Sequence, residues 1–114
     1  MPEFYKILDL AEWEQFRQEG LFAGSPVDLR DGFIHFSYAD QLAETARRHF
    51  AGRTGLVLLA IRPDRLGPAL RDEVSRGGAL FPHLYATLSI EDVVWDRPIA
   101  TDEDGLPVLP PLDP

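Results

Sequence analysis

The chain has 114 residues, no cysteine and a formal net charge of −8. This length fits one domain with a single core, and the lack of cysteine excludes disulfides and a thiolate nucleophile. The negative charge repels phosphate backbones, so broad nucleic-acid binding is not expected. We also expect a soluble, cytoplasmic protein without membrane association, because no apolar run approaches the roughly 18 residues of a spanning helix and no signal-peptide pattern opens the chain. The oligomeric state is not indicated.

The first elements are a strand over residues 4–8 and a helix that follows it. Asp9 and Glu12 have the spacing of a capping box, and Gly20 is the predicted end of the helix. Turn residues dominate positions 21–32, which contain Gly-Ser-Pro and Asp-Gly. We therefore expect a looping connection there.

A strand over 33–36 and a helix over 38–50 come next. Ser37 and Asp40 suggest the N-terminal cap of this helix, and Leu42, Ala46 and His49 recur on one face that we expect to point inward. The unbroken apolar run 56–61 predicts a strand that is buried on both faces at the centre of the sheet.

Three further strands are predicted over 70–74, 81–88 and 93–99, with a mobile loop at 75–78 and a capped turn at 89–92. The pattern predicts an α+β fold: a single domain over residues 1–100, with a mixed or antiparallel twisted sheet and two main helices. Residues 101–114 form an acidic, proline-rich tail that we expect to be extended and largely unpacked.

Two histidines stand out because each is followed two positions later by a hydroxyl residue. His35 precedes Ser37, and His83 precedes Tyr85. Because side chains alternate along a strand, each pair shares a face. We predict that His35 and His83 act in one site, on opposite walls of a cleft, with Ser37 and Tyr85 binding the ligand. The alternative is that each is a hydrogen-bonded core or edge histidine.

Three charged residues on and after the predicted strand 70–74 are further candidates. Glu73 is a candidate catalytic carboxylate that could orient a histidine, while Arg71 and Arg76 suit an anionic ligand group. Each has a plain surface role as its alternative. No metal site is predicted; zinc held by His35, His83 and Glu73 is the less favoured option, because their separations match no ligand motif.

Four segments carry a resemblance to a known family. They are Phe-Ala-Gly-Ser-Pro-Val-Asp at 22–28, Asp-Gly-Phe-Ile-His-Phe-Ser at 31–37, Leu-Val-Leu-Leu at 56–59 and Phe-Pro-His-Leu-Tyr at 81–85. In these segments the chain resembles the uncharacterised "domain of unknown function 952" family over about residues 4–99. That family name implies no activity.

The order of elements is also similar, more distantly, to the ADP-ribosyltransferase fold. There a strand with His-x-Ser/Thr precedes a helix and a buried strand, as at Ile34–Ser37, 38–50 and 56–59 here. The resemblance implies an NAD cleft in which His35 contacts a ribose hydroxyl and a late strand supplies a glutamate. The matching late strand presents His83 instead. Imidazole cannot replace a carboxylate that stabilises a cationic centre, but it suits proton transfer or phosphate binding.

Two functions follow as expectations. The first is a nucleotide- or NAD-related transferase or hydrolase that uses His35, His83 and Glu73. The second is a non-catalytic module that binds a nucleotide or another small anion. The same residues serve both, and NAD is the cofactor that the resemblance implies.

Overall fold

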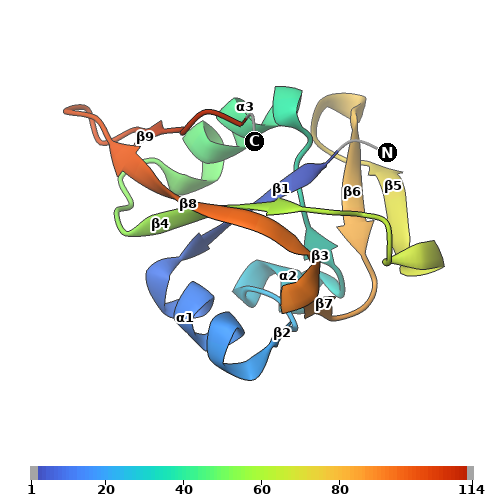
Figure 1. Ribbon diagram of the computed structural model, residues 1–114. Helices are drawn as coiled ribbons and strands as arrows, with labels where there is room; N and C mark the ends of the chain where they lie inside the picture. Colours follow the sequence, from blue (N-terminus) through green and yellow to red (C-terminus); the bar gives the residue numbers. More distant parts are fainter. Residues whose placement is uncertain (1–2, 113–114) are drawn as a thin grey trace.

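The structure is a computed structural model, and it describes residues 3–112. The ends of the predicted domain and tail, residues 1–2 and 113–114, lie outside this range. Residues 3–112 form short strands and three α-helices (Figure 1). In order the elements are β1 (Phe4–Asp9), α1 (Leu10–Glu19), β2 (Leu21–Phe22), α2 (Pro26–Asp31), β3 (Ile34–His35), α3 (Ala39–Phe50), β4 (Leu56–Ile61), η1 (Gly67–Ala69), β5 (Leu70–Val74), η2 (Arg76–Gly78), β6 (Leu80–Leu84), β7 (Leu88–Ser89), η3 (Ile90–Asp92), β8 (Val93–Thr101) and β9 (Pro107–Val108).

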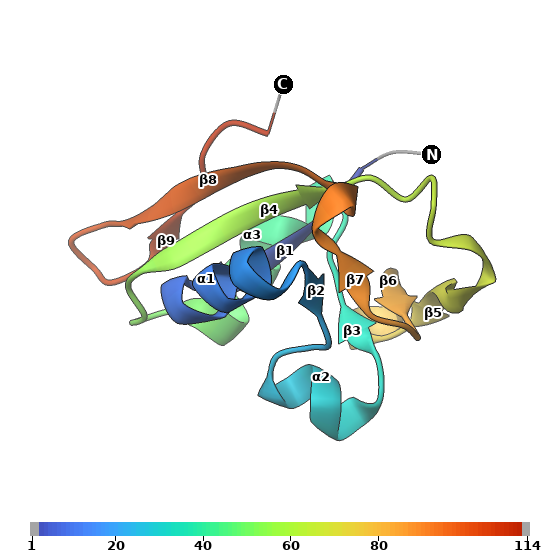
Figure 2. The same ribbon diagram turned by 60° about the horizontal axis from the view of Figure 1, so that its bottom comes forward.

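The strands form three antiparallel sheets. The largest has the order β1-β4-β8-β9, a second joins β3-β6-β5, and β2 pairs with β7. Figure 2 shows β3, β5 and β6 set to one side of the long strands β4 and β8. The predicted α+β class is confirmed, and every strand pair within residues 3–112 is antiparallel.

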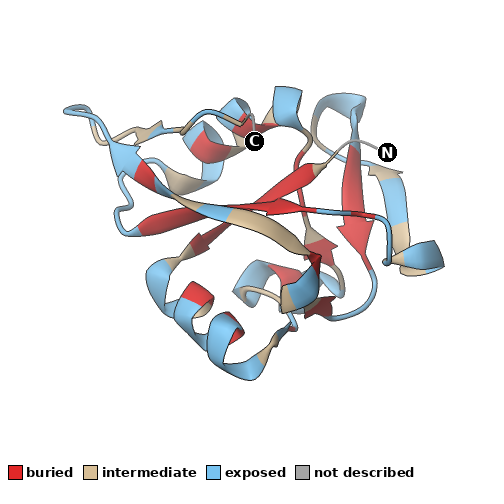
Figure 3. Ribbon diagram, viewed as in Figure 1, coloured by how far each residue is buried: buried red, intermediate tan, exposed pale blue. Residues whose placement is uncertain are grey.

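The central strand β4 explains the two-sided core. All six of its residues are buried, and alternate side chains point to opposite faces of the sheet. Val57 and Leu59 pack with α1 and the β3-β6 region, whereas Leu58 and Ala60 pack with α3. Figure 3 shows this buried strand between helices that are exposed on their outer faces. The prediction of a central, doubly buried strand at 56–61 is confirmed.

Two local predictions are wrong. The region 21–32 is not a plain loop, because it contains β2 and the short helix α2, which begins with Pro26 at its first position. The cap of α3 is Tyr38, whose N–H donates to Gln41 Oε1 at 3.0 Å. Ser37 is therefore free to bond elsewhere.

The C-terminal tail is packed, contrary to the expectation from its composition. β9 pairs with the end of β8, and Leu109 and Leu112 pack against the core cluster on the α3 face of the sheet. The segment packs despite its acidic, proline-rich composition, because Leu109 and Leu112 cover part of a sheet face that would otherwise be exposed to water.

Candidate functional site

One large cleft, of about 780 Å³, is the candidate functional site. All three histidines of the chain line it, so we call it the histidine cleft. Five of the eleven Lys and Arg residues also line it, but only three of the nineteen Asp and Glu residues do. The basic residues are Lys6, Arg30, Arg48, Arg53 and Arg76. A chain with a net charge of −8 thus has a cleft in which cationic groups predominate.

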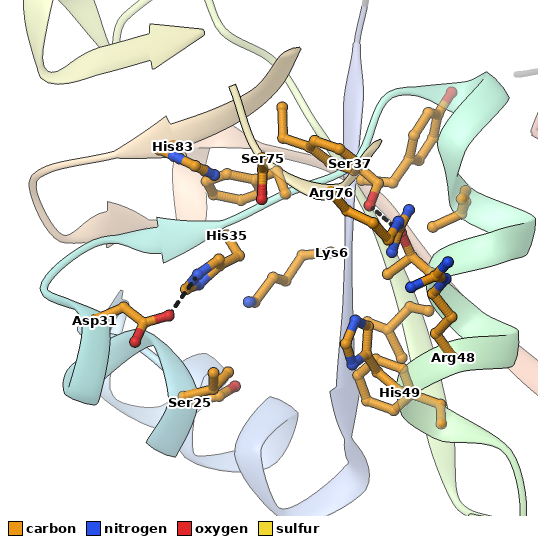
Figure 4. A pocket seen from close by; sticks show the side chains of 18 of the residues that line it. Lys6, Ser25, Asp31, His35, Ser37, Arg48, His49, Ser75, Arg76 and His83 are labelled. Carbon is orange, nitrogen blue, oxygen red and sulfur yellow. Dashed lines mark hydrogen bonds and ion pairs between the residues drawn. The ribbon is translucent and has the colours of Figure 1, made fainter. Parts of the chain in front are cut away.

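The histidine cleft lies beside β1, in the space between α2 with β3 and the helix α3. β1 is an edge strand of the large sheet, and a bridge between Tyr5 and Ser37 connects it to the segment after β3. Beyond that bridge β1 runs between α2 with β3 on one side and α3 on the other (Figure 4). The cleft opens along this edge of β1.

His35 and His83 are direct partners in the β3-β6 ladder. Their ring centroids are 5.4 Å apart, and the Phe33 ring stacks on His83 at 4.1 Å. Both rings line the cleft, so the structure brings the two predicted histidines together. Their expected placement on opposite walls is wrong, because antiparallel partners project from the same face of a sheet.

His35 is held by two carboxylates of α2. Asp28 Oδ1 lies 2.7 Å from His35 Nδ1, and Asp31 Oδ2 lies 3.0 Å from Nε2. Both bonds can form only when both ring nitrogens carry a proton. Asp28 also accepts from the backbone N–H groups of His35 and Ser25, so the ring is tied to the start of the helix.

Lys6 completes this cluster from β1. Its Nζ lies 2.9 Å from Asp28 Oδ2, and both side chains are buried. Burial lowers the pKa of Lys6, and the charge of Asp28 offsets part of that effect. Burial alone would raise the pKa of Asp28, but its bonds to His35 and Lys6 prevail and hold the pKa below the ordinary value. Lys6 and Asp28 therefore form a buried ion pair, to which the partly exposed His35 is bonded.

His83 is held by the neighbouring strand β5. Its Nδ1 lies 2.9 Å from Glu73 Oε1, and the Tyr85 hydroxyl donates to the same oxygen at 2.6 Å. The bond from Tyr85, followed by the bond from His83, lowers the pKa of Glu73. Glu73 itself lies outside the lining of the cleft. It does reach His83, and it fixes the imidazole with Nδ1 as donor.

Of the remaining predicted residues, Ser37 and Arg76 lie on the α3 side of the cleft. Ser37 Oγ lies 2.8 Å from Thr45 Oγ1, and Arg76 Nη2 donates to that same Thr45 oxygen at 3.2 Å. Ser37 and Arg76 therefore line the cleft but are not bonded to His35. Arg71 is not in the lining; its guanidinium stacks on the Tyr85 ring at 4.8 Å.

Sequence reasoning missed several residues of the cleft. His49, expected on the inward face of its helix, is exposed and lines the cleft. Asp31, which lines the cleft, and Asp28, which bonds His35 from behind the lining, fall in the segment that was predicted as a loop. Lys6 could have been noticed as a lone cation within an apolar strand, since an unpaired lysine is rarely buried.

Neither a metal-binding cluster nor a membrane-spanning helix is found within residues 3–112. No group of three or more His, Asp or Glu side chains there is arranged to hold a metal ion. No helix within that range is long and apolar enough to cross a membrane.

The architecture and the cleft define a small α+β domain with a basic, histidine-lined site. The chain belongs to the family described as "Protein of unknown function (DUF952)", whose model matches residues 7–96. This confirms the family resemblance. A comparison with curated proteins finds no match.

Solved structures of a related protein show the same fold. The crystal structure of protein CC0527 from Caulobacter crescentus is 48% identical, with a TM-score of 0.90 over 93% of each chain. The solution structure of CC0527 is also 48% identical, with a TM-score of 0.83 over 94% of this chain and 92% of that one. Neither description assigns an activity.

Proposed function

We propose that the histidine cleft binds a small, phosphate-bearing ligand of the nucleotide class and that His83 transfers a proton in a transferase or hydrolase reaction on it. The observation that carries the proposal is the gathering of three histidines and five Lys and Arg residues around one cleft in an acidic chain. Such a cleft concentrates anions, while the rest of the surface repels them.

His83 has the features of an acid–base group. Glu73 accepts from Nδ1, so in the neutral imidazole the lone pair is on Nε2, which has no hydrogen-bond partner among the side chains of residues 3–112. A carboxylate that fixes the tautomer of an imidazole is a recurrent device of proton-transfer sites. Tyr85 supports the dyad through the shared Glu73 oxygen.

His35 has a different role in this proposal. Asp28 and Asp31 occupy both of its nitrogens, so it cannot exchange a proton with a ligand unless one of these bonds breaks. We assign it to shaping the wall next to His83. The distant likeness to ADP-ribosyltransferases makes NAD the first compound to test.

The alternative is a binding module without turnover. It is favoured by the number of polar groups in the cleft that are already paired, since Lys6 and His35 are both held by Asp28. A rigid, preformed wall of this kind binds a ligand with little loss of entropy. It requires no chemical step.

The test is incubation of the protein with NAD and with ADP-ribose at millimolar concentration. Release of nicotinamide or ribose products is followed by chromatography, and binding is followed by thermal shift. We expect His83→Asn to abolish turnover, with Thr87→Ala, an exposed position outside the cleft lining, as the matched control. A shift without turnover supports the binding module. No shift and no product with either compound contradicts the nucleotide assignment.

A further inference from the structure

We infer that the α3 side of the histidine cleft is a phosphate subsite formed by Arg48, His49 and Arg76, with the hydroxyls of Ser37 and Thr45 beside them. This inference rests on the proposed function and specifies which end of the ligand lies where. The phosphate groups contact α3, and the uncharged part of the ligand lies toward His35 and His83.

The five residues come from three parts of the chain that converge on one side of the cleft. Figure 4 shows Arg48, His49, Arg76 and Ser37 on the α3 side, with Lys6 between them and His35. The link is made by Arg76, which reaches from η2 to Thr45 on α3. Its side chain is only 18% exposed, because it also stacks on the Phe81 ring at 4.9 Å. Packing thus holds the guanidinium in place over the cleft.

The charges here are not balanced. Glu44 is the carboxylate that pairs with the arginines of this side: Arg47 at 3.6 Å, Arg48 at 3.4 Å and Arg76 at 3.6 Å. One carboxylate shared among three guanidinium groups leaves a surplus of positive charge. These contacts are long and Glu44 is half-exposed, so each pair is weak. A phosphate, with more oxygens than a carboxylate, can take the places of Glu44.

His49 lies within this positive field. Partial desolvation by the neighbouring side chains lowers its pKa, and the charges of Arg76, Arg48 and His35 lower it further. Glu44, four residues away from Arg48 and bonded to it, is the nearby opposing charge. An imidazole placed among cations becomes easier to protonate when an anion binds beside it. It then adds a donor to the bound phosphate.

The opposite side of the cleft is unsuited to phosphate. Asp31 lines it, and Asp28 lies behind His35 with Lys6 already paired to it. The cations of this side, Lys6, Arg30 and His35, are already paired with Asp28 and Asp31, so no surplus of positive charge remains there for a phosphate. The two sides therefore impose an orientation on any ligand with one anionic end.

The test is NMR titration of the histidine ring signals with inorganic pyrophosphate, at fixed pH and ionic strength. We expect the His49 signals to move most. Arg76→Gln and Arg48→Gln should each raise the Kd about tenfold or more, the usual effect of removing a charge-assisted hydrogen bond. Glu44→Gln should lower the Kd, because it removes a competing carboxylate. Arg17→Gln, which breaks an exposed pair with Glu14 on α1, should leave it unchanged.

The outcomes separate this inference from the proposed function. If pyrophosphate shifts only the ring signals of His35 and His83, the location of the phosphate subsite is wrong, but the proposal that the cleft binds an anion is supported. If succinate, a dicarboxylate, binds as tightly as pyrophosphate, the assignment to phosphate is wrong. If pyrophosphate shifts the ring signals of none of the three histidines, but ADP-ribose shifts those of His35 and His83, only the phosphate subsite is wrong. If neither compound shifts any histidine ring signal, both the phosphate subsite and the proposed nucleotide-class function are overturned.

Discussion

Asp28 Oδ1 and His35 Nδ1 meet at 2.7 Å across the turn between α2 and β3. Asp28 simultaneously pairs with the buried Lys6 and accepts from the backbone at the start of α2. One carboxylate thus connects the edge strand of the large sheet to the histidine wall of the cleft. The geometry of the site depends on this connection.

Replacing Asp28 tests how much this unit contributes to stability. Asp28→Asn leaves Lys6 buried without its counter-charge, which typically costs about 3–5 kcal/mol. Asp31→Asn removes only the half-exposed partner of the same histidine, and we expect a loss below about 1 kcal/mol. Urea unfolding of both variants measures the difference. Equal, small losses would show that the buried pair contributes little.

The same carboxylate gives a pH dependence of defined sign. The pKa of Asp28 is lower in the folded protein than its ordinary value of 3.8, so the unfolded chain binds the proton more readily. Its stabilising contribution is present above that value and is lost as the pH falls through the folded pKa. We expect the free energy of unfolding of the wild type to decline below about pH 4. That decline should be shallower in Asp28→Asn; parallel curves would contradict the assignment.

A side chain at Gly24 is expected to displace Asp28. Its φ is +135°, and an added Cβ would lie 2.7 Å from the Cβ of Asp28. Gly24→Ala should therefore cost about 1–3 kcal/mol through backbone strain and displacement of Asp28. Gly32 is the matched control, because its φ is +87° and an added Cβ there would meet no atom within 4 Å. Gly32→Ala should cost only about 1–2 kcal/mol. The histidine NMR signals should shift in Gly24→Ala alone.

His35 and His83 should be coupled in ligand binding because they are register partners. His35→Asn, His83→Asn and the double variant form a cycle, measured by calorimetry with ADP-ribose. We expect the double change to weaken binding by less than the sum of the single changes, with a coupling of about 0.5–3 kcal/mol. Strict additivity would indicate that the two rings act separately.

The packed tail predicts that truncation is destabilising. Ending the chain at Gly105 removes the β9 pairing and the contacts of Leu109 and Leu112 with the core. We expect a lower Tm and a loss of about 2 kcal/mol or more, from the apolar surface that is uncovered. Val108→Ala, at a position that is 47% exposed, should have almost no effect. An unchanged Tm on truncation would restore the interpretation of an unpacked tail.

Local chemistry in the sequence was sufficient for several elements. Asp9 and Glu12, three residues apart, can each accept a hydrogen bond from a backbone N–H group at the start of a helix. This capping box is present at α1. The unbroken apolar run of β4 predicts burial on both faces, whichever strands and helices pack against it. The alternation of His35 and His83 with hydroxyl residues made the two histidines candidates for one site, but it did not indicate that they pair in a ladder.

Only the tertiary structure decided how the histidine cleft is built. The pairing of His35 with His83, and the reach of Glu73 to His83, depend on strand register, which joins residues far apart in the chain. Lys6 can be buried only because Asp28, distant in sequence, is placed against it. His49 continues an apolar helical pattern, yet it faces the cleft because β1 ends the sheet beside α3. Sequence periodicity reports which side chains share a face, whereas the packing of elements determines what that face meets.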